Sequence, residues 1–205
     1  MKTHYLIGLM ILGFYSAVSG QEVIQMNSTT EGLSAGVHLG LLSYTDDKIH
    51  AETEGGVGFG AEVQYGFTHQ IAASLAFQHY SVTPKSINST DSKYPYTEIE
   101  LLGKYIFGSS DQKLRPNLTL GINYTKSKEN FYDPQFNFAS LQTYSGLSLC
   151  GGGGVRYFLS PQMSIDLALL FNWGDYTTTL INGQEVDFSH SYFSWKTLLG
   201  FSYHF

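Results

Sequence analysis

Hydrophobic and polar residues alternate along eight stretches of this chain, and the last stretch shows the pattern most clearly. In Tyr192–Phe205 one face carries Phe193, Trp195, Leu199, Phe201, Tyr203 and Phe205, interrupted only by Thr197. Side chains of a β-strand point to alternate faces, so this spacing predicts one strand with an apolar face and a mostly polar face. Such a strand would be an exposed edge if unpaired, and we expect it to close onto the first strand as in a barrel.

Seven earlier stretches share this period of two. They are Leu33–Leu41, Gly56–Phe67, Ile71–Tyr80, Thr97–Tyr105, Asn117–Tyr124, Leu147–Leu159 and Met163–Trp173. Short links alternate with long ones, and Lys126–Tyr144 is the longest. The pattern predicts an all-β fold, an eight-stranded antiparallel up-and-down transmembrane β-barrel whose long loops lie outside the cell.

Alternation alone does not show which face points outward, because a soluble lipocalin-like barrel has the same period with its apolar face inside. Here the polar face is rich in Gly, Ala and Ser, which suits the filling of a narrow barrel. Aromatic residues also gather near strand ends, as in membrane-interface girdles: Phe67, Tyr105, Phe107, Tyr157, Tyr203 and Phe205 at one end, Tyr44, Tyr124 and Trp173 at the other. We therefore expect the apolar face to contact outer-membrane lipid.

Composition agrees with this interpretation. Charged residues make up only 14% of the chain, and a net charge of -6 argues against a nucleic-acid partner. Residues 1–20 have a positive start, an apolar run and small residues before Gln21, which predicts a secretory signal peptide. The barrel domain then covers residues 21–205, beginning with a short polar leader at 21–31. We expect no cofactor and no metal.

These features together resemble a known family. The segments Glu98–Phe107 and Gly152–Ser160 and the aromatic-ended final strand are similar to those of the small Gram-negative outer-membrane β-barrel proteins, the OmpA/OmpX-like and "porin family" barrels. The resemblance implies a monomer in the bacterial outer membrane. It also implies that the outer-membrane assembly machinery recognises the last strand, with Phe201, Tyr203 and Phe205 as the assembly signal.

Seven charged residues have inward parity and form the main candidate site. They are Glu62, Glu98, Glu100, Lys104, Arg156, Asp166 and Lys196. They could line an ion path, or they could form a salt-bridged plug, which is favoured because eight strands leave room only for side chains. If Leu159 pairs with Met163 across the tight link, Arg156 stands opposite Asp166.

Two motifs resemble catalytic or binding sites but fail in context. The run Cys150–Gly154 lies inside a strand with no helix after it, so it predicts a bend and not a phosphate-binding loop. The pair His79 and Ser81 resembles the exterior His-x-Ser pair of outer-membrane lipid A deacylases. The nearest acids, Glu98 and Glu100, have the opposite parity, so we expect no enzyme.

The long link carries four aromatic residues that could contact an unknown extracellular ligand: Phe131, Tyr132, Phe136 and Phe138. Alternatively, the flanking strands extend beyond the membrane and pair there. The sequence thus predicts an integral outer-membrane barrel with a side-chain-filled lumen and a structural or surface-interaction role. A narrow porin-like channel for small solutes is the alternative, and a lipid-modifying enzyme is a remote one.

Overall fold

The structure is a computed structural model that describes residues 30–46, 53–85, 89–133, 138–187 and 189–205. The predicted signal peptide and nearly all of the leader lie outside these residues. The described chain forms nine strands: β1 Gly32–Asp46, β2 Glu54–Gly66, β3 Ile71–Thr83, β4 Tyr94–Ile106, β5 Leu114–Asp133, β6 Phe138–Ser160, β7 Met163–Ile181, β8 Gln184–Val186 and β9 His190–His204. Among the described residues there is no helix long and apolar enough to span a bilayer.

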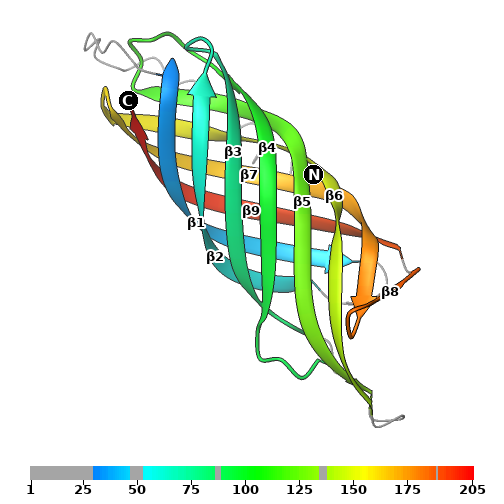
Figure 1. The fold of residues 1–205 in the computed structure, drawn as a ribbon. Helices are drawn as coiled ribbons and strands as arrows, with labels where there is room; N and C mark the ends of the chain where they lie inside the picture. Colours follow the sequence, from blue (N-terminus) through cyan, green and yellow to red (C-terminus); the bar gives the residue numbers. More distant parts are fainter. Residues whose placement is uncertain (1–29, 47–52, 86–88, 134–137, 188) are drawn as a thin grey trace, which may run out of the picture.

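Eight long strands close into one antiparallel barrel (Figure 1). Each strand from β1 to β7 pairs with the next along the chain, and β9 pairs with both β7 and β1. The predicted closure of the last strand onto the first is therefore confirmed, with Val37 opposite Phe201. Closure pairs the backbone groups of the spanning strands, as a membrane protein requires.

The barrel wall is apolar outside and polar inside, as the alternation predicts. Outward side chains such as Val37, Leu120 and Leu149 are more than 60% exposed. Inward side chains such as Gln78, Glu98 and Lys196 are fully buried. An outward apolar band around a closed sheet is the arrangement of a lipid-facing barrel, and the soluble-barrel alternative is wrong.

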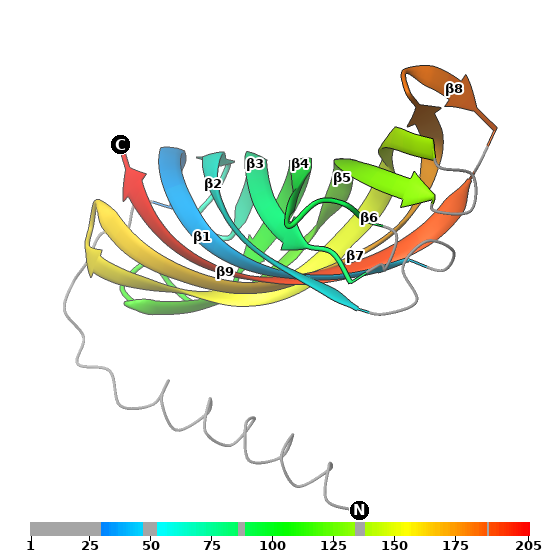
Figure 2. The same ribbon diagram turned by 90° about the horizontal axis from the view of Figure 1, so that it is seen from below.

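In the outer part of the barrel, the alternative that the strands flanking the longest link extend beyond the membrane and pair there is confirmed. Most of the predicted loop at 126–144 belongs to β5 and β6, which pair up to Asp133 and Phe138. Figure 1 shows this hairpin projecting beyond the other strands. Residues 175–187, which the alternating stretches leave as a link, contain the end of β7 and the short strand β8, which stands apart in Figure 2. Asn182 and Gly183 join them with positive φ angles of 51° and 83°, which is the turn that an Asn-Gly pair favours.

Two details of the sequence-based assignment are wrong. Tyr44 does not belong to the outer aromatic girdle, since it points into the barrel and is only 2% exposed. It lies on the same parity as His38 and Leu42, which also point inward. At the tight turn, Met163 pairs with Ser160 instead of Leu159, because a bulge shifts the register there. The shift ends before Arg156, which still stands opposite Asp166.

Candidate functional site

The lumen is the candidate site, and its filling depends on glycine in the first two strands. A Cβ atom on Gly58 would lie 2.5 Å from the Tyr80 ring, and one on Gly40 would lie 2.8 Å from it. Larger residues at either position would collide with Tyr80. The glycines of β1 and β2 therefore make room for bulky side chains from the facing strands, and these side chains form successive layers across the barrel.

The layer at the periplasmic end is built around Arg115 and Phe158. The Arg115 guanidinium lies over the Phe158 ring, with Cζ 4.7 Å from the ring centroid. It also donates hydrogen bonds to Thr30 Oγ1 (3.2 Å) and to the carbonyl of Ser110 (2.6 Å). The Phe158 ring also lies beside the His204 ring, with centroids 5.2 Å apart. These contacts occupy the inner mouth of the barrel.

The next layer contains the predicted pair of Arg156 and Asp166. Arg156 Nε donates to Asp166 Oδ1 at 2.5 Å, and a second guanidinium nitrogen donates to Gln64 Oε1 at 3.3 Å. The Ser202 hydroxyl donates to Asp166 Oδ2 at 2.8 Å. The pair thus bridges β6 and β7, and its hydrogen bonds reach β2 and β9.

Lys104 and Glu62 form a second ion pair beside the first. His38 Nε2 lies 3.7 Å from the other carboxylate oxygen of Glu62. Both ion pairs line a cavity of about 40 Å³, large enough for a few water molecules. The predicted extension of the charge network to these two residues is therefore present, around a small polar cavity.

An apolar layer lies next to this cavity. It consists of Leu102, Cys150, Leu170 and Leu198, all of which are at most 6% exposed. Cys150 is a buried free thiol, and its sulfur lies 3.9 Å from Glu100 Oε1. In the Cys150–Gly154 run, the inward glycines lie where the sheet leaves no space for a side chain. A Cβ atom on Gly152 would lie 2.1 Å from the carbonyl oxygen of Leu169.

The central layer is a fully buried charge triad. Lys196 Nζ donates to Glu98 Oε2 and, at 2.5 Å, to Glu100 Oε1. All three side chains have no exposed surface. Asn123 and Asn172 donate to Glu98 Oε1 at 2.7 Å and 3.0 Å. A buried charge is costly without such partners, so the triad and its two amides act as one unit.

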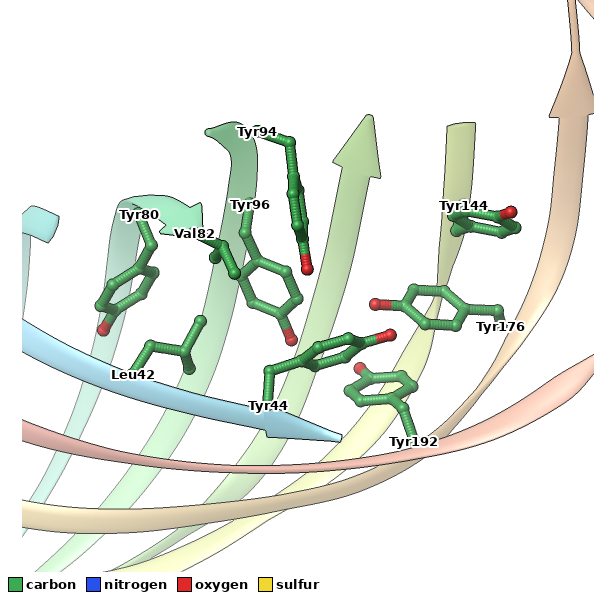
Figure 3. Close-up of a cluster of buried hydrophobic side chains, with 9 residues drawn as sticks. All are labelled: Leu42, Tyr44, Tyr80, Val82, Tyr94, Tyr96, Tyr144, Tyr176 and Tyr192. Carbon is green, nitrogen blue, oxygen red and sulfur yellow. The ribbon is translucent and has the colours of Figure 1, made fainter. Parts of the chain in front are cut away.

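The outermost layer is an aromatic cluster that the sequence analysis did not predict. Its members are Leu42, Tyr44, Tyr80, Val82, Tyr94, Tyr96, Tyr144, Tyr176 and Tyr192, shown in Figure 3. The rings of Tyr176 and Tyr192 stack at 4.5 Å, and Tyr44 lies 5.4 Å from Tyr96. The seven tyrosines come from six of the eight barrel strands and converge on the axis. Their inward parity was the signal available in the sequence.

The structure therefore places all seven predicted charges inside the barrel and divides them between two levels. Glu62, Lys104, Arg156 and Asp166 lie at the inner level, and Glu98, Glu100 and Lys196 lie at the central one. Sequence reasoning missed Arg115 and His38, which contribute to the inner levels. Among the described residues, no group of three potential ligands is placed to hold a metal ion.

The remaining candidates lie outside the lumen. Phe131 packs partly buried against the aromatic cluster, and Tyr132 is exposed on the projecting hairpin. Phe136 is outside the described residues, and Phe138 lies at the start of β6. Phe201, Tyr203 and Phe205 are 43–70% exposed on the outer wall, at the end of β9. The outward-facing His79 contacts Thr97, with Nδ1 and Oγ1 3.1 Å apart.

Several solved structures of outer-membrane proteins have a similar architecture. Neisserial surface protein A is 13% identical, covers 85% of this chain and 98% of its own, and has a TM-score of 0.60. OprG from Pseudomonas aeruginosa is 15% identical over 88% of this chain and 99% of its own, with a TM-score of 0.63. Ail of Yersinia pestis is 17% identical over 86% and 100%, with a TM-score of 0.56. At these identities the likeness shows the fold alone.

Sequence comparison gives the family directly. No curated protein matches this chain significantly. Residues 10–205, nearly the whole chain, match the family described as the outer membrane protein beta-barrel domain. The closed eight-stranded barrel with its apolar outer wall agrees with this match, and the chain belongs to the outer membrane protein beta-barrel family.

Proposed function

We propose that this protein is a closed, non-conducting barrel that works at the cell surface, as a monomer, through the part that projects beyond the membrane. The main observation in support of this proposal is that side chains fill the lumen. The arginine layer, two inner ion pairs, an apolar layer, the buried triad and the tyrosine cluster follow one another along the axis. A solute would have to displace several of these layers, each held by side chains from different strands.

The projecting strands support a role at the surface. The strands β5, β6 and β7 have 20, 23 and 19 residues, against 13 in each of β2, β3 and β4. Six to ten extra residues add about 20–30 Å to a strand. A paired hairpin of this length holds its side chains in place, whereas a flexible loop would lose conformational entropy on binding. Two similar proteins, Neisserial surface protein A and the attachment invasion locus protein of Yersinia pestis, are named for such roles, which fits this proposal.

The two other functions have weaker support. A narrow channel would need the polar cavity beside Lys104 to open through the layers on both sides of it. Catalysis at His79 would need an acid beside the ring, but Glu98 and Glu100 face the lumen on the other side of the wall. The described partner of His79 is Thr97, so the pair of His79 and Ser81 gives no support to a hydrolase.

A deletion strain tests the proposed function. Complementation with the full chain is compared with a hairpin-shortened variant, in which a two-residue turn joins Ser127 to Tyr144, a register pair of β5 and β6. We expect the variant to insert normally and to leave outer-membrane permeability unchanged, while cell-surface adhesion falls to the level of the deletion strain. Adhesion equal to wild type with altered permeability would contradict the proposal.

A further inference from the structure

The outer rim of the barrel contains a pocket of about 540 Å³, formed by the outer parts of β1, β7 and β9. Asp46, the last residue of β1, is opposite Tyr192 of β9, and Asp175 of β7 is opposite Ser191 of β9. All four residues line the pocket. A volume of about 300–1,000 Å³ is typical of sites for small molecules. The residues that line this pocket do not come from the projecting hairpin of β5 and β6, so it offers a site apart from that hairpin.

Two aromatic rings form the apolar side of the pocket. Trp173 of β7 is directly opposite Phe193 of β9, and their ring centroids are 5.6 Å apart with the planes inclined by 42°. Phe171 lies one row deeper in the wall and stacks on both rings, with centroid distances of 5.9 Å to Trp173 and 6.4 Å to Phe193. Trp173 is 53% exposed. Its indole is therefore held in place by its neighbours while much of its surface is open to a ligand.

Carboxylates form the polar side of the pocket. Asp175 is exposed and accepts a hydrogen bond from the Ser191 hydroxyl at 2.6 Å. The ion pairs found in the described part of the chain all involve residues other than Asp175. Asp46 is 5% exposed, and its Oδ2 accepts from the Tyr44 hydroxyl at 3.1 Å. The described lining residues include no Lys, Arg or His. The pocket therefore combines aromatic faces with negative charge, which favours a cationic ligand.

We propose that this pocket binds a soluble organic cation of the quaternary ammonium class, such as choline. The trimethylammonium group lies against the Trp173 ring, and the Asp175 carboxylate supplies the opposite charge beside it. Such a group has an apolar surface and donates no hydrogen bond, so an aromatic wall suits it better than it suits a primary amine. A soluble ligand is favoured over a lipid headgroup because the acidic side of the pocket lies beyond the last aromatic row, on the side facing water. The inference goes beyond the proposed function and does not depend on it.

Equilibrium dialysis of radiolabelled choline against the refolded full barrel in a maltoside detergent, at constant ionic strength, tests this site. Excess unlabelled choline should displace the label. The neutral isostere 3,3-dimethyl-1-butanol, in which carbon replaces the nitrogen, should not displace it. We expect Trp173→Leu to weaken choline binding about 10-fold, which corresponds to about 1.4 kcal/mol, because the cation loses its aromatic face. Asp175→Asn should weaken it about 5-fold, because the charge beside the ligand is lost.

Each variant has a matched control that does not line the pocket. Trp195→Leu removes the other tryptophan of the same wall, one row deeper on β9, and Asp187→Asn removes an exposed carboxylate just after β8. Both controls should bind choline as wild type does. The chain has two tryptophans, so in Trp195→Phe the only one left is Trp173, and choline should change its fluorescence. Circular dichroism and the heat-dependent shift on electrophoresis check that each variant is folded.

Three results would overturn the proposal. Displacement of choline by its neutral isostere would show that charge plays no part. A loss of binding in Trp195→Leu or Asp187→Asn equal to that in Trp173→Leu or Asp175→Asn would place the site elsewhere. Loss of choline binding when phosphatidylcholine vesicles replace the detergent would assign the pocket to a lipid headgroup. Unchanged binding in these vesicles would support a soluble ligand.

Discussion

Replacing Lys196 by Met should be among the most damaging single substitutions in the lumen. The ammonium group is the only cation paired with Glu98 and Glu100 in the described structure, and the three side chains have no exposed surface. Methionine keeps the length of the side chain but leaves two carboxylates facing each other. Removing one partner of a buried ion pair costs about 3–5 kcal/mol, and we expect a value in the upper half of this range because two acids lose their partner at once.

Reversible urea unfolding in phosphatidylcholine vesicles measures this effect. Trp173 and Trp195 are the only tryptophans of the chain, and both are partly exposed on the outer wall, so their fluorescence reports insertion. The control is Lys93→Met, the same change at an exposed position before β4, where we expect a shift within about 0.5 kcal/mol. Adding Glu98→Gln and Glu100→Gln to Lys196→Met removes the uncompensated charges and should restore much of the lost free energy.

The outcome decides whether the triad acts as described. A loss below about 1 kcal/mol in Lys196→Met would mean that water reaches the triad and replaces the missing charge. A triple variant no more stable than Lys196→Met alone would mean that packing, and not charge, accounts for the loss. Either result would refute the reasoning about a dry, charge-paired layer at the centre of the barrel.

Three further predictions concern the wall, the last strand and the inner mouth. Leu167→Arg places a charge on the lipid-facing side at mid-depth and should reduce the free energy of unfolding in vesicles by about 2–4 kcal/mol. Ser145→Arg, level with Lys126 at the outer rim, should reduce it by only about 0–1 kcal/mol. Equal losses in the two variants would contradict the assigned membrane position. Deleting Phe205 removes a backbone hydrogen bond to Leu33 (3.0 Å) and a ring contact with Tyr203. The amount of protein in outer-membrane fractions should therefore fall strongly. Wild-type amounts on immunoblots would argue against an assembly signal. Asp166→Ala leaves Arg156 without its carboxylate partner, so it should lower the free energy of unfolding and give small, flickering currents in a planar bilayer. An unchanged free energy of unfolding would show that the pair is dispensable.

The strands and the direction of their faces could be predicted from the sequence because a period of two is unambiguous over ten or more residues. The opposition of Arg156 and Asp166 could be predicted too, because a tight turn fixes the register of the strands it joins. The pairing of Lys196 with Glu98 and Glu100 could not, since these residues are 96 and 98 positions apart and meet only across the closed lumen. Parity gives the direction of a side chain but not its partner on the far wall.

In the outer half, the sequence left loop and extended strands open as alternatives for a different reason. Beyond the membrane, strands no longer need an apolar outward face, so alternation fades in β5 and β6 after Tyr124 although the pairing continues. The Asn182–Gly183 turn was a readable signal of the β7–β8 hairpin. The inward direction of Tyr80 and Tyr192 follows from their parity, but parity does not show that the rings from six strands meet on the axis. Tyr44 was assigned to a girdle by its position near a strand end, without regard to its inward parity.

The central claim is that the lumen is closed, and single-channel recording in a planar bilayer tests it most directly. Purified refolded wild-type protein should give no large, stable conductance, since the arginine layer, the buried triad and the tyrosine cluster each obstruct the axis. A steady conductance of porin size from the wild-type protein would contradict the account and favour a channel for small solutes.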